Sequence, residues 1–129
     1  MIVDIVKQWM KCRKAMLTAI EKLNGTHSED GILARLFTKQ MHLLTNGSTG
    51  IVLEIVEYEC FKALNVFLLG GNIDEVAKLV PEIERLRVAH GCKRVMGLAT
   101  PDDEGRSRAE GWSRLFEAKP FGTFMYRDY

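Results

Sequence analysis

The sequence predicts an α/β protein in which a mixed, mostly antiparallel sheet is flanked by helices. Three observations carry this prediction. Ala63–Leu69 is a nearly unbroken apolar run, short enough to be a strand covered on both faces. A glycine turn and an amphipathic helical pattern follow it, and Cys92–Met96 then resumes as a strand. A buried strand, a turn, a helix and a further strand form an α/β unit, and ligands usually bind at the turn that leaves the first strand.

The helix of this unit is predicted from apolar residues that recur on one helical face, namely Val76, Leu79, Val80, Ile83 and Leu86. Gly91 is a suitable C-terminal cap. Pro81 lies inside the pattern, where it removes a donor and clashes with the carbonyl of Ala77, at a cost of about 3 kcal/mol. We therefore expect a kink, or a helix that restarts at Pro81. Either would move the N-terminus of the helix.

Two helices are predicted before the sheet. Residues 2–23 carry apolar side chains at steps of three and four, and Asn24-Gly25 ends the pattern. A membrane-surface helix is the alternative interpretation, but a small sheet needs a helix to cover it. Ser28 is a good N-cap for a second helix that reaches Phe37, with acidic residues in its first turn. His27 is then either a ligand or base, or a polar residue beside the cap.

The remaining strands lie on both sides of the central run. Met41–Leu44 is predicted as the first strand and Ile51–Tyr58 as the second, antiparallel to Ala63–Leu69. The alternation of the second strand places four residues on one face: Val52, Glu54, Val56 and Tyr58. Cys92–Leu98 is the fourth strand. A polar loop over 99–107, a short helix over 108–118 and a last strand over 121–126 complete the chain.

Length and composition are those of one globular domain. The 129 residues are expected to form a single domain, with helices over about 2–37 and the sheet with its other helices over about 40–128. The net charge of +1 gives no field that favours nucleic acid or an anionic membrane, so neither is an expected partner. Polar residues interrupt the apolar pattern at the start of the chain, so we expect no signal peptide.

The cysteines and histidines do not predict a metal site. The three cysteines are an odd number without CxxC spacing, and we expect them to be buried free thiols in a reducing compartment. The three histidines are not at metal-ligand spacing either. A basic cluster could bind an anion or nucleic acid, but acidic neighbours favour a solvated, salt-bridged surface; its members are Lys93, Arg94, Arg106, Arg108 and Arg114.

The order of elements resembles the acetyltransferase fold of the GNAT superfamily. Within it, the chain is most similar to GNAT-like proteins encoded by tailed bacteriophages. The motifs that carry the resemblance are Leu69-Gly70-Gly71, Asp74-Glu75, Ala89-His90-Gly91-Cys92-Lys93-Arg94, and Arg108 with Gly111-Trp112-Ser113-Arg114-Leu115. Gly25-Thr26-His27 and Ile51–Tyr58 also fit. Residues 100–107 form a longer segment than usual, which affects the alignment around Arg108.

The resemblance implies that acetyl-CoA, where it binds, meets the turn formed by Leu69, Gly70, Gly71 and Asn72. Catalytic GNAT enzymes hold the pyrophosphate there on backbone N–H groups of a Gln/Arg-x-x-Gly-x-Gly/Ala turn at a helix N-terminus. This chain has no arginine or glutamine three residues before the first glycine, and its second glycine is adjacent. Asp74 and Glu75 place negative charge at the same point. They suit the helix dipole and oppose a phosphate.

A second departure concerns the general acid. Many GNAT enzymes use a tyrosine of the short helix to protonate the leaving thiolate. The best-matched position here is Trp112, whose indole cannot exchange a proton at neutral pH. Glu54, an acid in the middle of a strand, is the candidate general base. Its alternative interpretation is a carboxylate on the solvated face of the sheet.

Two functions of different classes follow from these residues and the resemblance. The first is a non-catalytic phage protein, a virion, assembly or host-interaction component, located in the host cytoplasm or the virion. It would bind a phage or host protein, could form a homo-oligomer, and needs no cofactor. The second is a GNAT-type N-acyltransferase that uses acetyl-CoA through a non-standard turn, with Glu54 as base. The sequence leaves open whether the protein is an enzyme.

Overall fold

The computed structural model describes residues 2–98, 114–119, 125 and 127–129. The chain divides into two compact units, residues 1–98 and residues 99–129. In the second unit, residues 114–116 form one helical turn, and the Arg127 guanidinium lies 4.8 Å from the centre of the Tyr129 ring. The predicted loop at 99–107, the position of Trp112 and the predicted strand at 121–126 lie outside the described residues, as does most of the predicted helix at 108–118.

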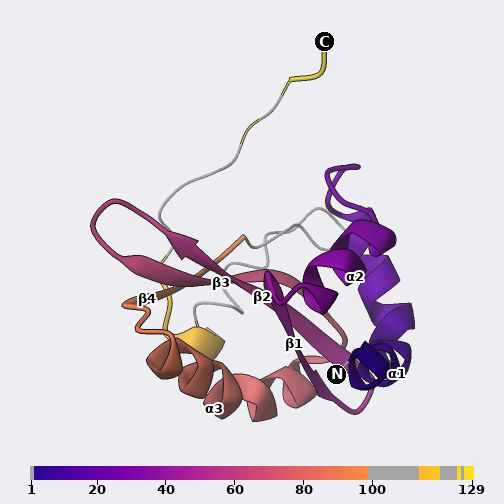
Figure 1. The fold of residues 1–129 in the computed structure, drawn as a ribbon, viewed down its shortest axis with the longest axis horizontal. Helices are drawn as coiled ribbons and strands as arrows, with labels where there is room; N and C mark the ends of the chain where they lie inside the picture. The colour runs from indigo at the N-terminus through magenta and orange to yellow at the C-terminus, as the bar shows by residue number, and fades with distance from the viewer. Residues whose placement is uncertain (1, 99–113, 120–124, 126) are drawn as a thin grey trace. The chain divides into compact units, whose positions relative to one another are not determined.

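The first unit is a four-stranded sheet with helices on both faces, as Figure 1 shows. Its elements are α1 (Ile2–Glu21), α2 (Glu29–Phe37), β1 (Met41–Asn46), β2 (Thr49–Glu57), β3 (Lys62–Gly70), α3 (Ile73–Ala89) and β4 (Arg94–Gly97). The strand order is β1-β2-β3-β4. The first three strands are antiparallel, and β4 lies parallel to β3. The predicted α/β class with a mixed, mostly antiparallel sheet is confirmed.

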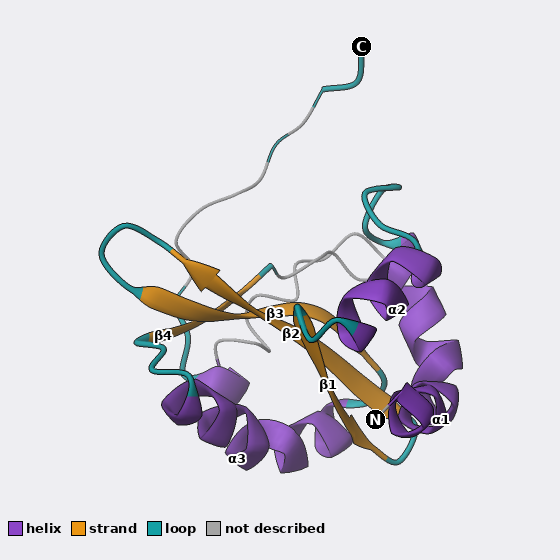
Figure 2. Cartoon of the chain, in the orientation of Figure 1, coloured by secondary structure: helices purple, strands orange, loops and turns teal. Residues whose placement is uncertain are grey.

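A tight turn and a longer hairpin connect the three antiparallel strands. Asn46 pairs with Thr49 across a loop of two residues, and Gly47, the first of them, has a φ of 59°. A glycine with positive φ at this place suits the hairpin turns that match strand twist. The longer β2–β3 connection extends away from the helices in Figure 2. At that hairpin Tyr58 contacts Phe61, and the Arg94 guanidinium lies over the Phe61 ring.

Helices α1 and α2 cover one face of the sheet and enclose a hydrophobic core with it. Its buried members are Trp9, Cys12, Met16, Ile32, Leu36, Met41, Val52 and Leu68. The predicted apolar stripe of the first helix is the face that enters this core. Ser28 caps α2 as predicted, since its side chain accepts a hydrogen bond from the N–H of Gly31 at 3.1 Å.

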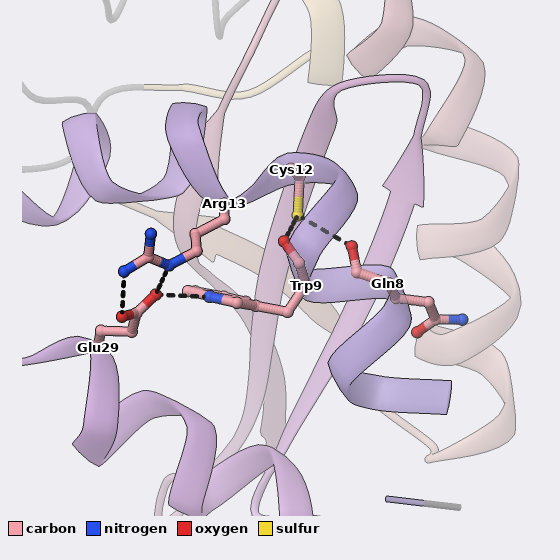
Figure 3. A network of polar contacts seen from close by, with 5 residues as sticks. All are labelled: Gln8, Trp9, Cys12, Arg13 and Glu29. Carbon is pink, nitrogen blue, oxygen red and sulfur yellow. Dashed lines mark hydrogen bonds and ion pairs between the residues drawn. The ribbon is translucent and has the colours of Figure 1, made fainter. Parts of the chain in front are cut away.

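A polar network joins α1 to α2, drawn in Figure 3. The Trp9 indole N–H donates to Glu29 Oε2 at 2.8 Å, and the Arg13 guanidinium donates to both oxygens of the same carboxylate, at 2.8 and 3.0 Å. Hydrogen bonds from Arg13 and then Trp9 lower the pKa of Glu29. A single acidic residue in the first turn of α2 therefore fixes the position of that helix on α1.

Helix α3 covers the other face of the sheet and packs chiefly against β1. It buries Val76, Leu79 and Ile83, three of the five residues that predict it. The helix runs unbroken from Ile73 to Ala89 with Pro81 inside it, so the predicted restart at Pro81 is wrong. The packing of the buried side chains on both sides of Pro81 compensates for the lost hydrogen bond. The C-cap is His90 and not the predicted Gly91, which follows it with a φ of 69°.

Among the described residues, none of the helices combines the length and the apolar character that crossing a bilayer requires.

Candidate functional site

The turn between β3 and α3 is the predicted ligand site, and it is built from two glycines and a helix cap. Strand β3 ends at Gly70, Gly71 has a φ of 127°, and Asn72 is the N-cap of α3. The Asn72 side chain accepts a hydrogen bond from the N–H of Glu75 at 2.9 Å. A Cβ at Gly71 would lie 2.0 Å from Thr49 Oγ1, so both its backbone conformation and its close neighbour require glycine.

Gly70 has a packing role that the sequence does not indicate. A Cβ there would lie 2.5 Å from the carbonyl oxygen of Ala15 in α1. Gly50 pairs with Gly70 across the ladder, and a Cβ added at Gly50 would lie 2.6 Å from Cys12 Sγ. The two paired glycines therefore form the place where α1 crosses the sheet. Gly70 is explained by this contact without any ligand.

The N-terminus of α3 holds the carboxylate of Glu75. Glu75 Oε1 accepts hydrogen bonds from Thr49 Oγ1 at 2.9 Å, from Asn72 Nδ2 at 3.0 Å and from Ser48 Oγ at 3.4 Å. The other carboxylate oxygen lies so close to Gly47 that a Cβ there would be 1.7 Å away. An anion at a helix N-terminus is stabilised by the helix dipole and the first N–H groups. Here that anion belongs to the protein.

Further hydrogen bonds connect the β1–β2 turn to the start of α3. The backbone N–H of Asn72 donates to Thr49 Oγ1 at 3.0 Å, and Asn46 Nδ2 donates to the carbonyl oxygen of Glu75 at 3.1 Å. The β1–β2 turn is thereby tied to the start of α3. Asp74, the other acid of the first turn, is exposed. Two backbone N–H groups of the turn, those of Asn72 and Glu75, already have acceptors inside the protein.

A second feature near this turn was not predicted, namely a bulge and an open edge in β3. Val52 pairs with Leu68 and Leu53 with Val66, so Phe67 is an extra residue in β3. The parallel ladder with β4 ends at Val66, and the last residues of β3 have no strand on that side among the described residues. Nothing in an unbroken apolar run marks a bulge, so sequence reasoning could not find it.

Glu54, the candidate base, lies on the α1–α2 side of the sheet and away from the turn. It is half-buried and accepts a hydrogen bond from Asn65 Nδ2 at 3.0 Å, its partner across the ladder. Gly50 pairs with Gly70, so Glu54 is four residues, about 13 Å, along β2 from the end of β3. The structure therefore does not bring Glu54 together with Gly70, Gly71 and Asn72.

The three histidines lie in two places, His27 beside β3 and the other two next to each other. His27 contacts Phe67 edge-on, with ring centres 4.6 Å apart, next to the bulge. His42 in β1 and His90 at the end of α3 have ring centres 5.3 Å apart. Burial, and then the charge of His90, lower the pKa of His42. In the described part of the chain no group of three or more histidine, cysteine, aspartate or glutamate residues could hold a metal ion.

The cysteines differ from the expectation in one case. Cys12 and Cys92 are buried free thiols as expected, but Cys60 is an exposed free thiol. It lies in the connection between β2 and β3. Of the predicted basic cluster, Arg106 and Arg108 lie outside the described residues, and Lys93, Arg94 and Arg114 are exposed.

The chain matches no family model, and no curated protein matches it. Among solved structures it is similar to an aminoglycoside acetyltransferase, meta-AAC0020, from an uncultured soil metagenomic sample, determined in complex with trehalose. The TM-score is 0.68 with 13% sequence identity, over 99% of this chain and 91% of that protein.

A likeness at this identity establishes the fold. The chain has the GNAT-like acetyltransferase fold, a mixed sheet flanked by helices, as the sequence predicts.

Proposed function

We propose that this chain is a non-catalytic protein that uses the acetyltransferase fold as an interaction scaffold and carries a degenerate acetyl-CoA site. The single observation that carries the proposal is the Glu75 carboxylate at the N-terminus of α3, held by Thr49, Asn72 and Ser48. In a working enzyme of this fold, the CoA pyrophosphate would occupy the same helix end.

Electrostatics explains why carboxylate and pyrophosphate exclude each other. Two unit charges of the same sign 4 Å apart repel by about 4 kcal/mol at the effective dielectric of a protein surface. A basic side chain could offset this repulsion, but Phe67 stands three residues before Gly70, where catalytic relatives place arginine or glutamine. Without that side chain, an incoming pyrophosphate has to displace a carboxylate that already accepts hydrogen bonds from three side chains.

The biological setting of the proposal comes from the resemblance to GNAT-like proteins of tailed phages. We place the protein in the host cytoplasm or the virion, as an assembly or host-interaction component with a phage or host protein as partner. This placement is tested by probing purified particles with an antibody against the chain. Signal that survives removal of loosely attached protein is expected of a virion component.

A second function, N-acyl transfer from acetyl-CoA, is supported by the open edge of β3. The unpaired backbone beyond Val66 could bind an extended ligand with amide groups, such as the pantetheine arm of CoA, in the manner of an added strand. Glu54 would then act as the base, oriented by Asn65. Leu69, Gly70, Gly71 and Asn72 would line the turn, although the N–H of Asn72 is already bonded to Thr49.

Calorimetric titration with acetyl-CoA distinguishes the two functions. The wild type is compared with Glu75→Gln and with Asp74→Asn, a matched control that removes the same charge from the same helix turn without touching the network. For a scaffold we expect no binding by any of the three proteins, because the arginine is still missing. A dissociation constant in the low micromolar range for the wild type, about −8 kcal/mol, would contradict the proposal.

The acyltransferase makes the opposite prediction. If the turn is a weakened pyrophosphate site, Glu75→Gln should tighten binding at low salt by about tenfold, or 1.4 kcal/mol, and Asp74→Asn by less. Urea unfolding of both variants ensures that they are folded. Acetyl transfer to an amine, followed as release of the CoA thiol, then has to disappear in Glu54→Gln.

A further inference from the structure

The outer edge of β1 is an unprotected strand edge. β1 is the first strand of the sheet, and no described strand pairs with its outer side. Its residues are Met-His-Leu-Leu-Thr-Asn, without proline, lysine or an inward-pointing charge, and without a bulge in its ladder with β2. Proteins usually protect exposed edges with such features, because a free edge pairs with other strands.

The register shows which backbone groups point outwards. Asn46 and Thr49 close a two-residue hairpin and form a hydrogen-bonded pair. Hydrogen-bonded and non-hydrogen-bonded pairs alternate in an antiparallel ladder. Met41, Leu43 and Thr45 are therefore in the non-hydrogen-bonded pairs, and their N–H and C=O groups face away from β2.

A groove lies along this edge. Its volume is about 440 Å³, and it is open to solvent. Residues 43–46 of β1 form one wall, Gln8 of α1 contributes from one face of the sheet, and Lys78, Leu79 and Glu82 of α3 contribute from the other. A strand placed beside β1 would therefore contact helices on both faces in addition to the edge itself.

We infer that a second copy of this chain occupies the groove, so that the two β1 strands pair antiparallel about a twofold axis and form one continuous sheet. The outward-facing residues are symmetric about Leu43: Leu43 would pair with Leu43 of the copy, and Met41 with Thr45. Side chains opposite each other in an antiparallel pair point to the same face. The α1–α2 layers of both copies would lie on one face, and the two α3 helices on the other.

Charge favours the second copy over another partner. Lys78 and Glu82 are one helical turn apart and both line the groove. In a twofold pair the two α3 helices run antiparallel on the same face, so Lys78 of each copy would face Glu82 of the other. Lys78 has no ion-pair partner among the described residues, whereas Glu82 pairs with Arg85. The groove thus carries both charges that a self-complementary surface needs.

The test is the association state of the full-length chain, measured by sedimentation velocity from 1 to 200 μM protein, concentrations on the order expected for a modest interface. We expect a reversible dimer. Lys78→Glu should weaken dimerisation at least tenfold by placing two acids opposite each other, and the charge swap Lys78→Glu with Glu82→Lys should restore it. Lys14→Glu, which makes the same charge change on the exposed side of α1, should leave the dimer intact.

A backbone variant tests the strand pairing. Thr45→Pro removes an N–H that points outwards and takes no part in the β1–β2 ladder, so the monomer should fold while dimerisation is lost. Circular dichroism and urea unfolding verify folding. A chain that stays monomeric at all concentrations overturns the inference and leaves the edge to an extended segment of another protein. A dimer that neither Lys78→Glu nor Thr45→Pro weakens overturns it too.

Discussion

Replacing Gly70 by alanine tests how closely α1 crosses the sheet. The new Cβ would lie 2.5 Å from the carbonyl oxygen of Ala15, 2.8 Å from its carbonyl carbon and 3.1 Å from the Met16 nitrogen. An ordinary contact begins at 3.4 Å, so the two backbones must separate by about 0.9 Å, the difference between 3.4 and 2.5 Å. The three atoms belong to the backbone of α1, so none of them can rotate away as a side chain would. Overpacking of this kind costs about 1–3 kcal/mol.

Urea unfolding followed by circular dichroism measures the effect. With a slope of about 2 kcal/mol/M, a loss of 2 kcal/mol lowers the midpoint by about 1 M. Gly31→Ala is the control, because its Cβ would meet only the Ser28 hydroxyl at 3.3 Å inside α2. We expect it to be neutral or stabilising, since alanine favours helix. A midpoint for Gly70→Ala equal to that of the wild type would refute the close crossing.

Three further predictions concern the helices and the histidine pair. Trp9→Ala should lower the free energy of unfolding by about 3–5 kcal/mol, because the indole is buried under α2. Glu29→Gln should cost about 1 kcal/mol at neutral pH, and this difference should fade as acid protonates the wild-type carboxylate, whose pKa is lowered in the folded state. Because the pKa of His42 is lowered in the folded state, the unfolded chain binds the proton more readily, so stability should fall as pH drops below about 6.5. In urea unfolding, the free energy of unfolding should fall less between pH 7.5 and 5.5 for His42→Gln than for the wild type. His90→Gln should raise the pKa of His42, as measured by NMR.

Local patterns predicted most of the fold, because each depends on residues that are close in the sequence. The N-cap Ser28, the positive φ of Gly91 after α3 and the antiparallel strands on both sides of the Cys60 connection all follow from spacing or turn chemistry. Pro81 is the instructive exception. Its intrinsic cost predicts a break, yet the apolar face of α3 continues across it, and tertiary packing decides the outcome.

The candidate site was predicted less well, because its geometry depends on residues far apart in the chain. The sequence does predict that the acids of the α3 first turn are poor neighbours of a phosphate. That Glu75 reaches Thr49, 26 residues away, could not be read from the sequence. The bulge at Phe67 depends on the register of β2 against β3, which apolar runs do not specify. The pairing of Glu54 with Asn65 has the same origin.

The internal carboxylate at the start of α3 has a thermodynamic consequence. A protein whose anion site is filled by a metabolite becomes more stable as the concentration of that metabolite rises. Here the anion is attached to the chain itself, three residues from Asn72 and 26 residues from Thr49, so its effective concentration is fixed by the fold and not by the supply of a metabolite. The order of the β1–β2 turn and of the α3 start should therefore not change with the concentration of free phosphate or CoA. The conformation of this turn is set by the chain alone.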